Sequence, residues 1–269
     1  MTTILVPVDF SETSKNAARY ASDMAKSIND TRLVFFHVFD PIAAGSDGTP
    51  LNISVADRKK IAEMAIENLS AEIGNTSPST IIAREGTSLV DTVTDYVRGE
   101  SCDLVVMGIT GAGKLANILM GSNSLKMVKQ VSVPVLIIPP NAWFSGLKTQ
   151  AFATDVKDVK TTTPASQIRS FLDLFKPVLK IVHINADGSP VNPADEAQLA
   201  ELLAPYGSPV QVVRNNDFLD GLDSFISREK VDCIITVPKQ HGFLQGLFQP
   251  SHTRQLAHHT HIPILAIHE

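Results

Sequence analysis

Glycines and hydroxyl side chains cluster after the apolar run Leu-Val-Val-Met at 104–107. Gly108 and Gly111 follow this run directly, and a second group, Gly-Ser-Asn-Ser, occupies 121–124. Glycines at the end of a strand and the start of a helix leave backbone N–H groups open to a ligand, and the positive end of the helix dipole favours an anion there. The spacing therefore predicts an anion site, and we expect its anion to be a nucleotide phosphate.

Candidate ligand groups also follow two other predicted strands. Asp9 comes after the first strand, where a carboxylate could accept hydrogen bonds from a ribose hydroxyl or an adenine amino group. Val38 comes after the second strand and could contact a base. Ligands of open parallel sheets bind outside the carboxyl ends of the strands, so these residues should meet 107–113. Taken singly, Asp9 and Ser122 also fit the role of helix N-cap.

The elements that must position these residues alternate regularly between strand and helix. Continuous apolar, β-branched runs predict parallel strands, covered on both faces, at 3–8, 32–39, 79–84, 103–108 and 133–138. Amphipathic stretches predict the helices between them, and Ser54 and Gly74 are the expected N-cap and C′ residues of the second. The alternation predicts an α/β fold built on an open, doubly wound, Rossmann-like parallel sheet.

The second half of the chain repeats the first. Asp9 and His37 recur 146 residues later as Asp155 and His183, whereas the runs at 103–106 and 133–138 recur 129 residues later. The two offsets differ by 17 residues, which places extra length of the first half within 39–80, including the Gly- and Pro-bearing loop 40–51. A Pro-Pro pair at 139–140 ends the first unit. We therefore expect two tandem five-stranded domains, at 1–140 and 147–269.

The spacing Gly108-x2-Gly111-x9-Gly121-Ser122, in its strand context, resembles the ATP-binding signature of the universal stress protein family. The opening run Ile-Leu-Val-Pro-Val-Asp-Phe-Ser at 4–11 and the pair His-Val at 37–38 resemble that family too. The resemblance implies a role in stress tolerance and pairing of the halves through their last strands as a pseudo-dimer, with a further homodimer left open. It also implies ATP or another adenine nucleotide, with or without Mg²⁺, at the matching positions Pro7, Asp9, Val38, Met107, Gly108, Gly111, Gly113, Gly121, Ser122, Asn123 and Ser124.

The second half departs from this signature at its three spacing glycines. Their counterparts at the offset of 129 are Val237, Gln240 and Pro250. Bulkier side chains then stand where backbone would approach phosphate, and Pro250 lacks an N–H. We therefore predict one nucleotide site, in the first half, with Asp155 kept as a cap or a solvent-facing carboxylate. A small-molecule or lipid pocket in the second half is an open alternative.

Enzymatic interpretations of the same residues are weaker. Residues 108–114 fit the G-x4-G-K part of a P-loop, but Leu115 stands where that motif needs Ser or Thr for Mg²⁺. Asp9, Ser11 and His37 could be imagined as a triad, but we expect His37 to pack or to bond to backbone. The sequence therefore predicts no catalytic residues and a nucleotide-dependent regulatory module that binds a protein partner of unknown identity. A slow ATPase or a nucleotidyl-transfer enzyme is the alternative.

Composition narrows the partners and the compartment. The formal net charge is −5 without a long basic run, so the sequence favours neither nucleic acid nor an acidic membrane surface as a partner. We expect a cytoplasmic protein, since no targeting or spanning segment stands out. Two cysteines exclude a disulfide framework. His258 and His261 have a spacing that could suit zinc, but a solvated helix face is the favoured interpretation.

Overall fold

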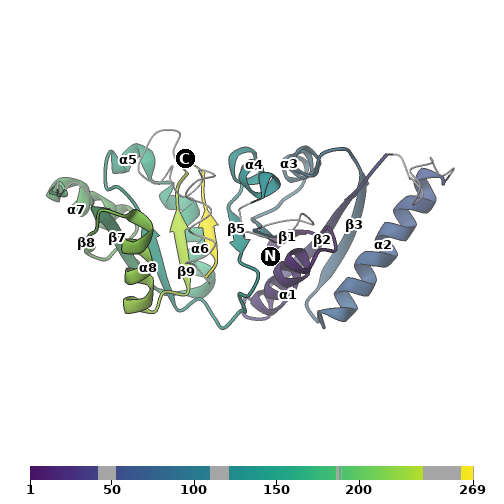
Figure 1. The fold of residues 1–269 in the computed structure, drawn as a ribbon, viewed down its shortest axis with the longest axis horizontal. Coiled ribbons are helices and arrows are strands. Elements are labelled where there is room, and N and C mark those ends of the chain that lie inside the picture. The colour runs from purple at the N-terminus through teal and green to yellow at the C-terminus, as the bar shows by residue number, and fades with distance from the viewer. Residues whose placement is uncertain (42–52, 110–120, 186–187, 189, 239–261, 269) are drawn as a thin grey trace.

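The computed structural model describes residues 1–41, 53–109, 121–185, 188, 190–238 and 262–268 (Figure 1). The first half contains β1 (Thr2–Pro7), α1 (Glu12–Ala25), β2 (Thr31–Phe39), α2 (Val55–Glu72), β3 (Ser79–Glu85), α3 (Leu89–Gly99), β4 (Leu104–Gly108), α4 (Ser122–Gln130) and β5 (Val135–Ile138). The second half contains β6 (Thr149–Ala153), α5 (Val159–Thr162), α6 (Ala165–Phe175), β7 (Val178–Asn185), α7 (Pro193–Leu202), β8 (Val210–Arg214), α8 (Phe218–Glu229), β9 (Cys233–Thr236) and β10 (Ile264–Ala266). The predicted strands of the first half agree with these bounds to within two residues.

All ten strands belong to one sheet, in the order β3-β2-β1-β4-β5-β10-β9-β6-β7-β8. Pairing is parallel within each half, and β5 and β10 join the halves in an antiparallel seam (Figure 1). Leu136 pairs with Leu265, its own counterpart at the offset of 129. The expected α/β class with doubly wound parallel half-sheets is confirmed, and the two half-sheets form one continuous surface related by a local two-fold axis through the seam.

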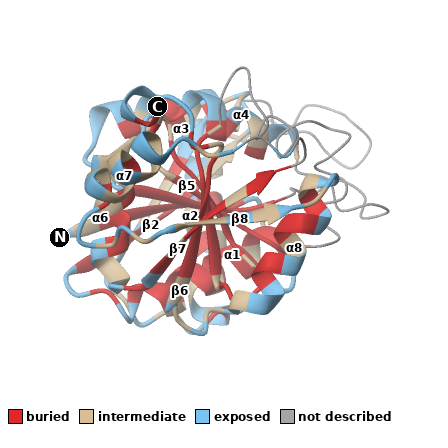
Figure 2. Ribbon diagram, turned by 90° about the vertical axis from the view of Figure 1, so that its left-hand side faces the viewer, coloured by how far each residue is buried: buried red, intermediate tan, exposed pale blue. Residues whose placement is uncertain are grey.

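Hydrophobic cores cover both faces of this sheet, because strand side chains alternate between faces. One core lies beneath α1, α2 and α6 and contains residues of both halves, such as Val6 and Phe152. The opposite face has two separate cores, one beneath α3 and α4 that includes Leu5, and one beneath α8 that includes Ala151. Figure 2 shows this distribution, with buried residues along the central strands and the inner helix faces. The α1 and α6 face therefore ties the halves together.

The sequence repeat extends to individual hydrogen bonds. The Asp103 carboxylate accepts from the backbone N–H of Thr3 at 2.7 Å, and Asp232 accepts from that of Thr149 at 2.9 Å. Each aspartate precedes the fourth strand of its half and accepts a hydrogen bond from an N–H near the start of the neighbouring first strand, at the buried Thr3 and the half-buried Thr149. The same contact thus fixes the register of the two central strands in both halves.

The α2 segment accounts for part of the extra length of the first half. Ser54 is its N-cap, since its Oγ accepts from the N–H of Asp57, and Gly74 follows it with φ of +65°, as the sequence predicts. α2 has 18 residues, whereas its counterpart α7 has 10. The remaining extra residues fall in the connection before α2, most of which lies outside the described residues. The prediction of a functional loop at 40–51 therefore stays a prediction.

Candidate functional site at the carboxyl ends of the first-half strands

Asp9 lies exposed directly after β1, where Ser11 orients its carboxylate. Its Oδ1 accepts from the Ser11 N–H at 3.0 Å and from the Ser11 hydroxyl at 2.5 Å. Ser11 in turn accepts from the N–H of Ser14 and is the N-cap of α1. Asp9 is therefore not the N-cap of α1, and the alternative that the sequence left open is wrong. Its carboxylate lies two residues before the cap, at the carboxyl edge of the sheet.

His37 is held by the backbone at the same edge. Its Nδ1–H donates to the carbonyl of Val8 at 2.7 Å, and its ring lies 4.7 Å from that of Phe10. The same bond recurs in the second half, where His183 contacts the carbonyl of Thr154 at 3.1 Å. The expectation that His37 packs and bonds to backbone is confirmed. The histidine links β1 to the end of β2, while the Ser11 hydroxyl donates to Asp9.

Gly108, the last residue of β4, is in close contact with α1. A Cβ at this position would lie 2.8 Å from the carbonyl oxygen of Thr13, a distance that real Cβ atoms essentially never show. We explained this glycine from the sequence by phosphate approach, but the structure gives a different physical reason, which is the close crossing of helix and strand. In the second half a buried Val237 occupies the corresponding position.

Ser124 is a structural contact at the start of α4. Its side chain is 2% exposed, and its hydroxyl lies 3.1 Å from the carbonyl oxygens of both Gly108 and Ile109. The N–H of Gly121 donates to the Ile109 carbonyl at 2.7 Å. These bonds hold the helix start against the end of β4. Ser124 therefore serves the β4 to α4 junction, and its expected contact with phosphate stays a prediction.

The first turn of α4 lacks a side-chain cap. The N-cap is Gly121, so the alternative of Ser122 as the cap is wrong, and Ser122 and Asn123 are exposed as the first helical residues. The other three helices of the first half each have a serine N-cap whose oxygen accepts a backbone N–H, namely Ser11, Ser54 and Ser88. A helix start without such an acceptor is suited to an anion.

The remaining predicted site residues differ in how deeply they are buried. Pro7 and Met107 are buried in β1 and β4 and belong to the strands that carry the carboxyl edge. Val38 is half-buried near the end of β2 and packs against the core beneath α3 and α4. Gly111 and Gly113 lie outside the described residues.

Comparison with known proteins places the chain in a family. Residues 1–139, just over half of its length, match the universal stress protein family. The chain belongs to the universal stress protein family. A universal stress protein of Thermus aquaticus is 28% identical over 141 residues, a match that covers 51% of this chain and 97% of that protein. One of Mycolicibacterium smegmatis is 31% identical over 143 residues, which cover 50% of this chain and 47% of its relative.

The tandem fold has a counterpart among solved structures. The crystal structure of a universal stress protein from Archaeoglobus fulgidus superposes with a TM-score of 0.72 at 19% identity, covering 99% of this chain and 96% of that one. At this identity the likeness concerns the fold. It extends over both halves of this universal stress protein, whereas the family match covers the first.

Arg58 is a residue of this edge that sequence reasoning missed. Its guanidinium donates to the carbonyls of Asp40 and Pro41 and to the Glu85 carboxylate at 2.9 Å, and it lies over the ring of Phe39. Only 12% of its side chain is exposed. Arg58 thus fixes the chain directly after β2, next to Val38. An arginine in the charged stretch of an amphipathic helix gives no sequence signal for such a role.

A left-handed turn after β1 was also missed. Phe10 has φ of 64°, and Val156, its counterpart at the offset of 146, has φ of 51°. Bulky and β-branched residues rarely adopt this conformation, so neither sequence suggests it. The left-handed residue recurs after the first strand of each half, so this turn is a feature of the fold that both halves share.

The second-half edge and the metal hypothesis are described only in part. Asp155 is half-exposed and does not cap α5, whose N-cap is Asp158. Gln240, Pro250, His258 and His261 lie outside the described residues, so the zinc hypothesis stays untested. Within the described ranges, no three His, Cys, Asp or Glu side chains gather as metal ligands, and no helix has the length and apolarity to cross a membrane.

Proposed function

We propose that this universal stress protein binds an adenine nucleotide, ATP or a close relative, at the carboxyl edge of its first half, and that it acts as a regulatory binding module in the stress response. Nucleotide occupancy would alter its affinity for a protein partner through residues 40–51 or through the pairing of the halves. The observation that carries the proposal is the start of α4, which has exposed Ser122 and Asn123 and no side-chain cap.

The phosphates would bind at this helix start. The N–H groups of a helix start and the helix dipole both favour an anion there, and Ser122 and Asn123 add a hydroxyl and an amide. The N-cap residue, Gly121, has no side chain of its own that could compete for these N–H groups. Mg²⁺ would accompany the nucleotide through its own phosphate oxygens.

The nucleoside would bind over the neighbouring strands. Asp9 is exposed at the end of β1, with Ser11 holding one oxygen of its carboxylate, so it suits a ribose hydroxyl or an adenine amino group. Val38 offers an apolar surface one strand away, because β1 pairs with β2. These groups supply base and sugar contacts beside the phosphate contacts.

We infer binding in preference to turnover as the role of this edge. The Ser11 hydroxyl donates to the Asp9 carboxylate, while the His37 ring is tilted by 48° to that of Phe10 and donates its Nδ1–H to the Val8 carbonyl, so the described contacts join no serine to a histidine base. Release of inorganic phosphate from ATP and Mg²⁺ should therefore be slow compared with nucleotide exchange. Steady multiple turnover would favour the enzymatic alternative.

Substitution of Ser122 by proline tests the site with little expected cost to the fold. Proline is tolerated at the first helical position, and the preceding Gly121 has ψ of 154°, a conformation compatible with a following proline. Ser122→Pro removes one N–H from the helix start together with the Ser122 hydroxyl, and Ser122→Ala, which removes the hydroxyl alone, separates the two contributions. Calorimetric titration with ATP should show affinity reduced by about tenfold, the effect of one hydrogen bond to a charged group.

The matched control is Val55→Pro, at the first position of α2 after Ser54, whose ψ is 153°. It removes the equivalent N–H from a helix start that already has a serine cap. ATP affinity should stay at the wild-type value in this variant. The assignment fails if the wild-type protein does not bind ATP, or if Ser122→Pro binds it as tightly as the control.

A further inference from the structure

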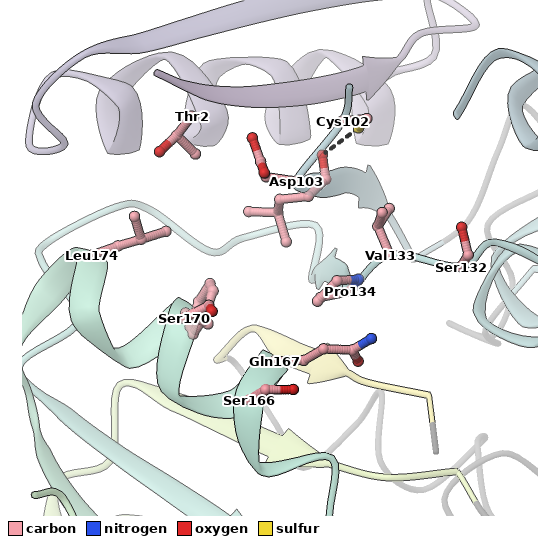
Figure 3. A pocket seen from close by; sticks show the side chains of 12 residues that line it. Thr2, Cys102, Asp103, Ser132, Val133, Pro134, Ser166, Gln167, Ser170 and Leu174 are labelled. Carbon is pink, nitrogen blue, oxygen red and sulfur yellow. Dashed lines mark hydrogen bonds between the residues drawn. The ribbon is translucent and has the colours of Figure 1, made fainter. Parts of the chain in front are cut away.

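A cavity of about 360 Å³ lies between the two halves, away from the carboxyl edge of the first half. One wall is the amino ends of the central first-half strands, with Thr2, Asp103 and Leu104, together with residues 132–134 before β5. The other wall is one face of α6 (Figure 3). Because strands β1 and β4 run from this cavity to the nucleotide edge, the two places lie at opposite ends of the same strands.

The polar lining of this cavity is rich in hydrogen-bond acceptors. The Oε1 atom of Gln167 is buried and has no hydrogen-bond partner in the described structure. Ser166 and Ser170 stand beside it on α6, and Asp103 contributes a carboxylate from the facing wall (Figure 3). The Gln167 Oε1 atom is covered from solvent, so the accepting groups that a ligand in the cavity can reach are the Asp103 carboxylate and the hydroxyls of Ser166 and Ser170, all three of which are exposed.

Charge and shape of the lining restrict the ligand further. No lysine, arginine or histidine is found among its described lining residues, and Asp103 is the one acidic residue there. Leu104, Phe171 and Leu174 supply apolar surface. Anions are therefore disfavoured, and the volume lies at the small end of ligand pockets.

The local two-fold axis shows why this space is open. At the related position, beside Asp232 and Cys233, α1 places Tyr20, which is 3% exposed and packs edge-on against Phe144 at 5.4 Å. Burial is the main cause that raises the Tyr20 pKa, and the nearby Cys233 and Asp232 raise it further. On α6 the corresponding face carries Ser166 and Gln167. On the α1 side an aromatic side chain thus occupies the space beside the sheet, whereas on the α6 side smaller polar side chains leave the corresponding space open.

We propose that the interhalf cavity binds a small molecule with an apolar body and a hydrogen-bond donor group, either neutral or singly positive. The donor group bonds to the Asp103 carboxylate, and the apolar body contacts Leu104, Phe171 and Leu174. Entry is along α6, where Ser166 and Ser170 are exposed. This site is independent of the nucleotide proposal.

Three probes with the same phenyl body test the ligand class, namely benzylamine, benzyl alcohol and benzoate. Each is titrated into the ¹⁵N-labelled full chain and followed by the amide signals of α6 and the side-chain amide of Gln167. ATP is present throughout, so that the carboxyl edge is not sampled. We expect benzylamine and benzyl alcohol to bind with dissociation constants on the order of 1 mM. Benzoate should bind at least about tenfold more weakly, because it brings a negative charge toward Asp103.

Two variants and one control locate the binding. Ser170→Leu fills the cavity and should abolish the shifts from both binding probes, whereas Ser224→Leu, at an exposed serine of α8, should leave them unchanged. Gln167→Glu adds a second negative charge and should strengthen benzylamine binding about fivefold relative to benzyl alcohol. This second variant decides the question if circular dichroism shows that Ser170→Leu does not fold.

The proposal is overturned if neither benzylamine nor benzyl alcohol shifts the α6 signals, or if benzoate binds as well as benzylamine. It is equally overturned if a folded Ser170→Leu protein binds benzylamine with wild-type affinity. Loss of ATP binding in Ser122→Pro leaves these titrations unaffected, so failure of one proposal does not imply failure of the other.

Discussion

Leu136 pairs with Leu265 across the antiparallel seam between β5 and β10, and each is the other's counterpart in the repeat. Both residues are fully buried, and both belong to the core on the α1 and α6 face, which contains residues of both halves. The local two-fold axis passes between them. The seam is therefore interior to one core, and we expect the two halves to unfold together.

Leu136→Ala tests this joint core. Removing a buried leucine side chain should lower the free energy of unfolding by about 2–5 kcal/mol. Urea denaturation should show one transition shifted to lower concentration. Ile61→Ala is the control, because Ile61 is 58% exposed on α2 and its truncation should change stability by less than about 0.5 kcal/mol. Two separate transitions, with one unaffected by Leu136→Ala, would contradict a joint core.

Gly108→Ala tests the contact between β4 and α1. The added methyl group would press on the Thr13 carbonyl, so stability should fall by about 1–3 kcal/mol even without nucleotide. Gly99→Ala is the matched control at the end of α3, where a Cβ has open space and alanine should be neutral or stabilising by up to ~1 kcal/mol. Thermal denaturation of both variants measures the difference. Equal stability of the two would show that the crossing is not close.

Ser124→Ala and Ser122→Ala separate fold from ligand binding. Ser124 holds α4 to the end of β4, so its loss should lower the free energy of unfolding by about 1–2 kcal/mol. Ser122 is exposed and is not the cap, so its replacement should leave stability unchanged and weaken ATP binding. Chemical denaturation and ATP titration of each variant are the measurements. A stability loss in Ser122→Ala equal to that in Ser124→Ala would argue against this division.

His268 should make stability depend on pH on the acid side. Burial lowers the pKa of His268 below its usual 6.5, since the charged form is disfavoured in the fold. The unfolded chain then takes up the proton first, so stability is full above about pH 6.5 and is lost as pH falls toward the folded-state value. Denaturation at about pH 7.5 and about pH 5.5 should show a smaller loss in His268→Gln than in the wild type. Identical losses would exclude His268 as a cause.

The arrangement of strands and helices could be predicted from local patterns. Strand bounds follow from short apolar runs, and the limits of α2 follow from Ser54 and Gly74, whose preferences depend on neighbouring backbone alone. The sequence repeat pairs His37 with His183 at an offset of 146, and in the structure both rings contact the backbone carbonyl of a matching residue.

The roles of individual site residues were less accessible. Gly108 and Ser124 look like ligand groups in the sequence, yet their contacts depend on how closely α1 and α4 approach β4, which is a property of packing. Arg58 reaches the chain after β2 across the space between two elements, and no spacing rule records such a contact. The cavity could not be anticipated either, because its lining comes from separate segments, at Thr2, 102–104, 132–134 and 166–174, that only the joined sheet brings together.

The seam between β5 and β10 has a consequence for what each half can become. In a symmetric homodimer every substitution is made twice, so neither copy can change its site alone. In a single chain with the same two-fold arrangement, each half can change alone. The two halves already differ at equivalent positions, where Gly108 corresponds to Val237 and Tyr20 to Ser166. One polypeptide can therefore hold two unlike ligands where a symmetric pair would be bound to hold the same one twice.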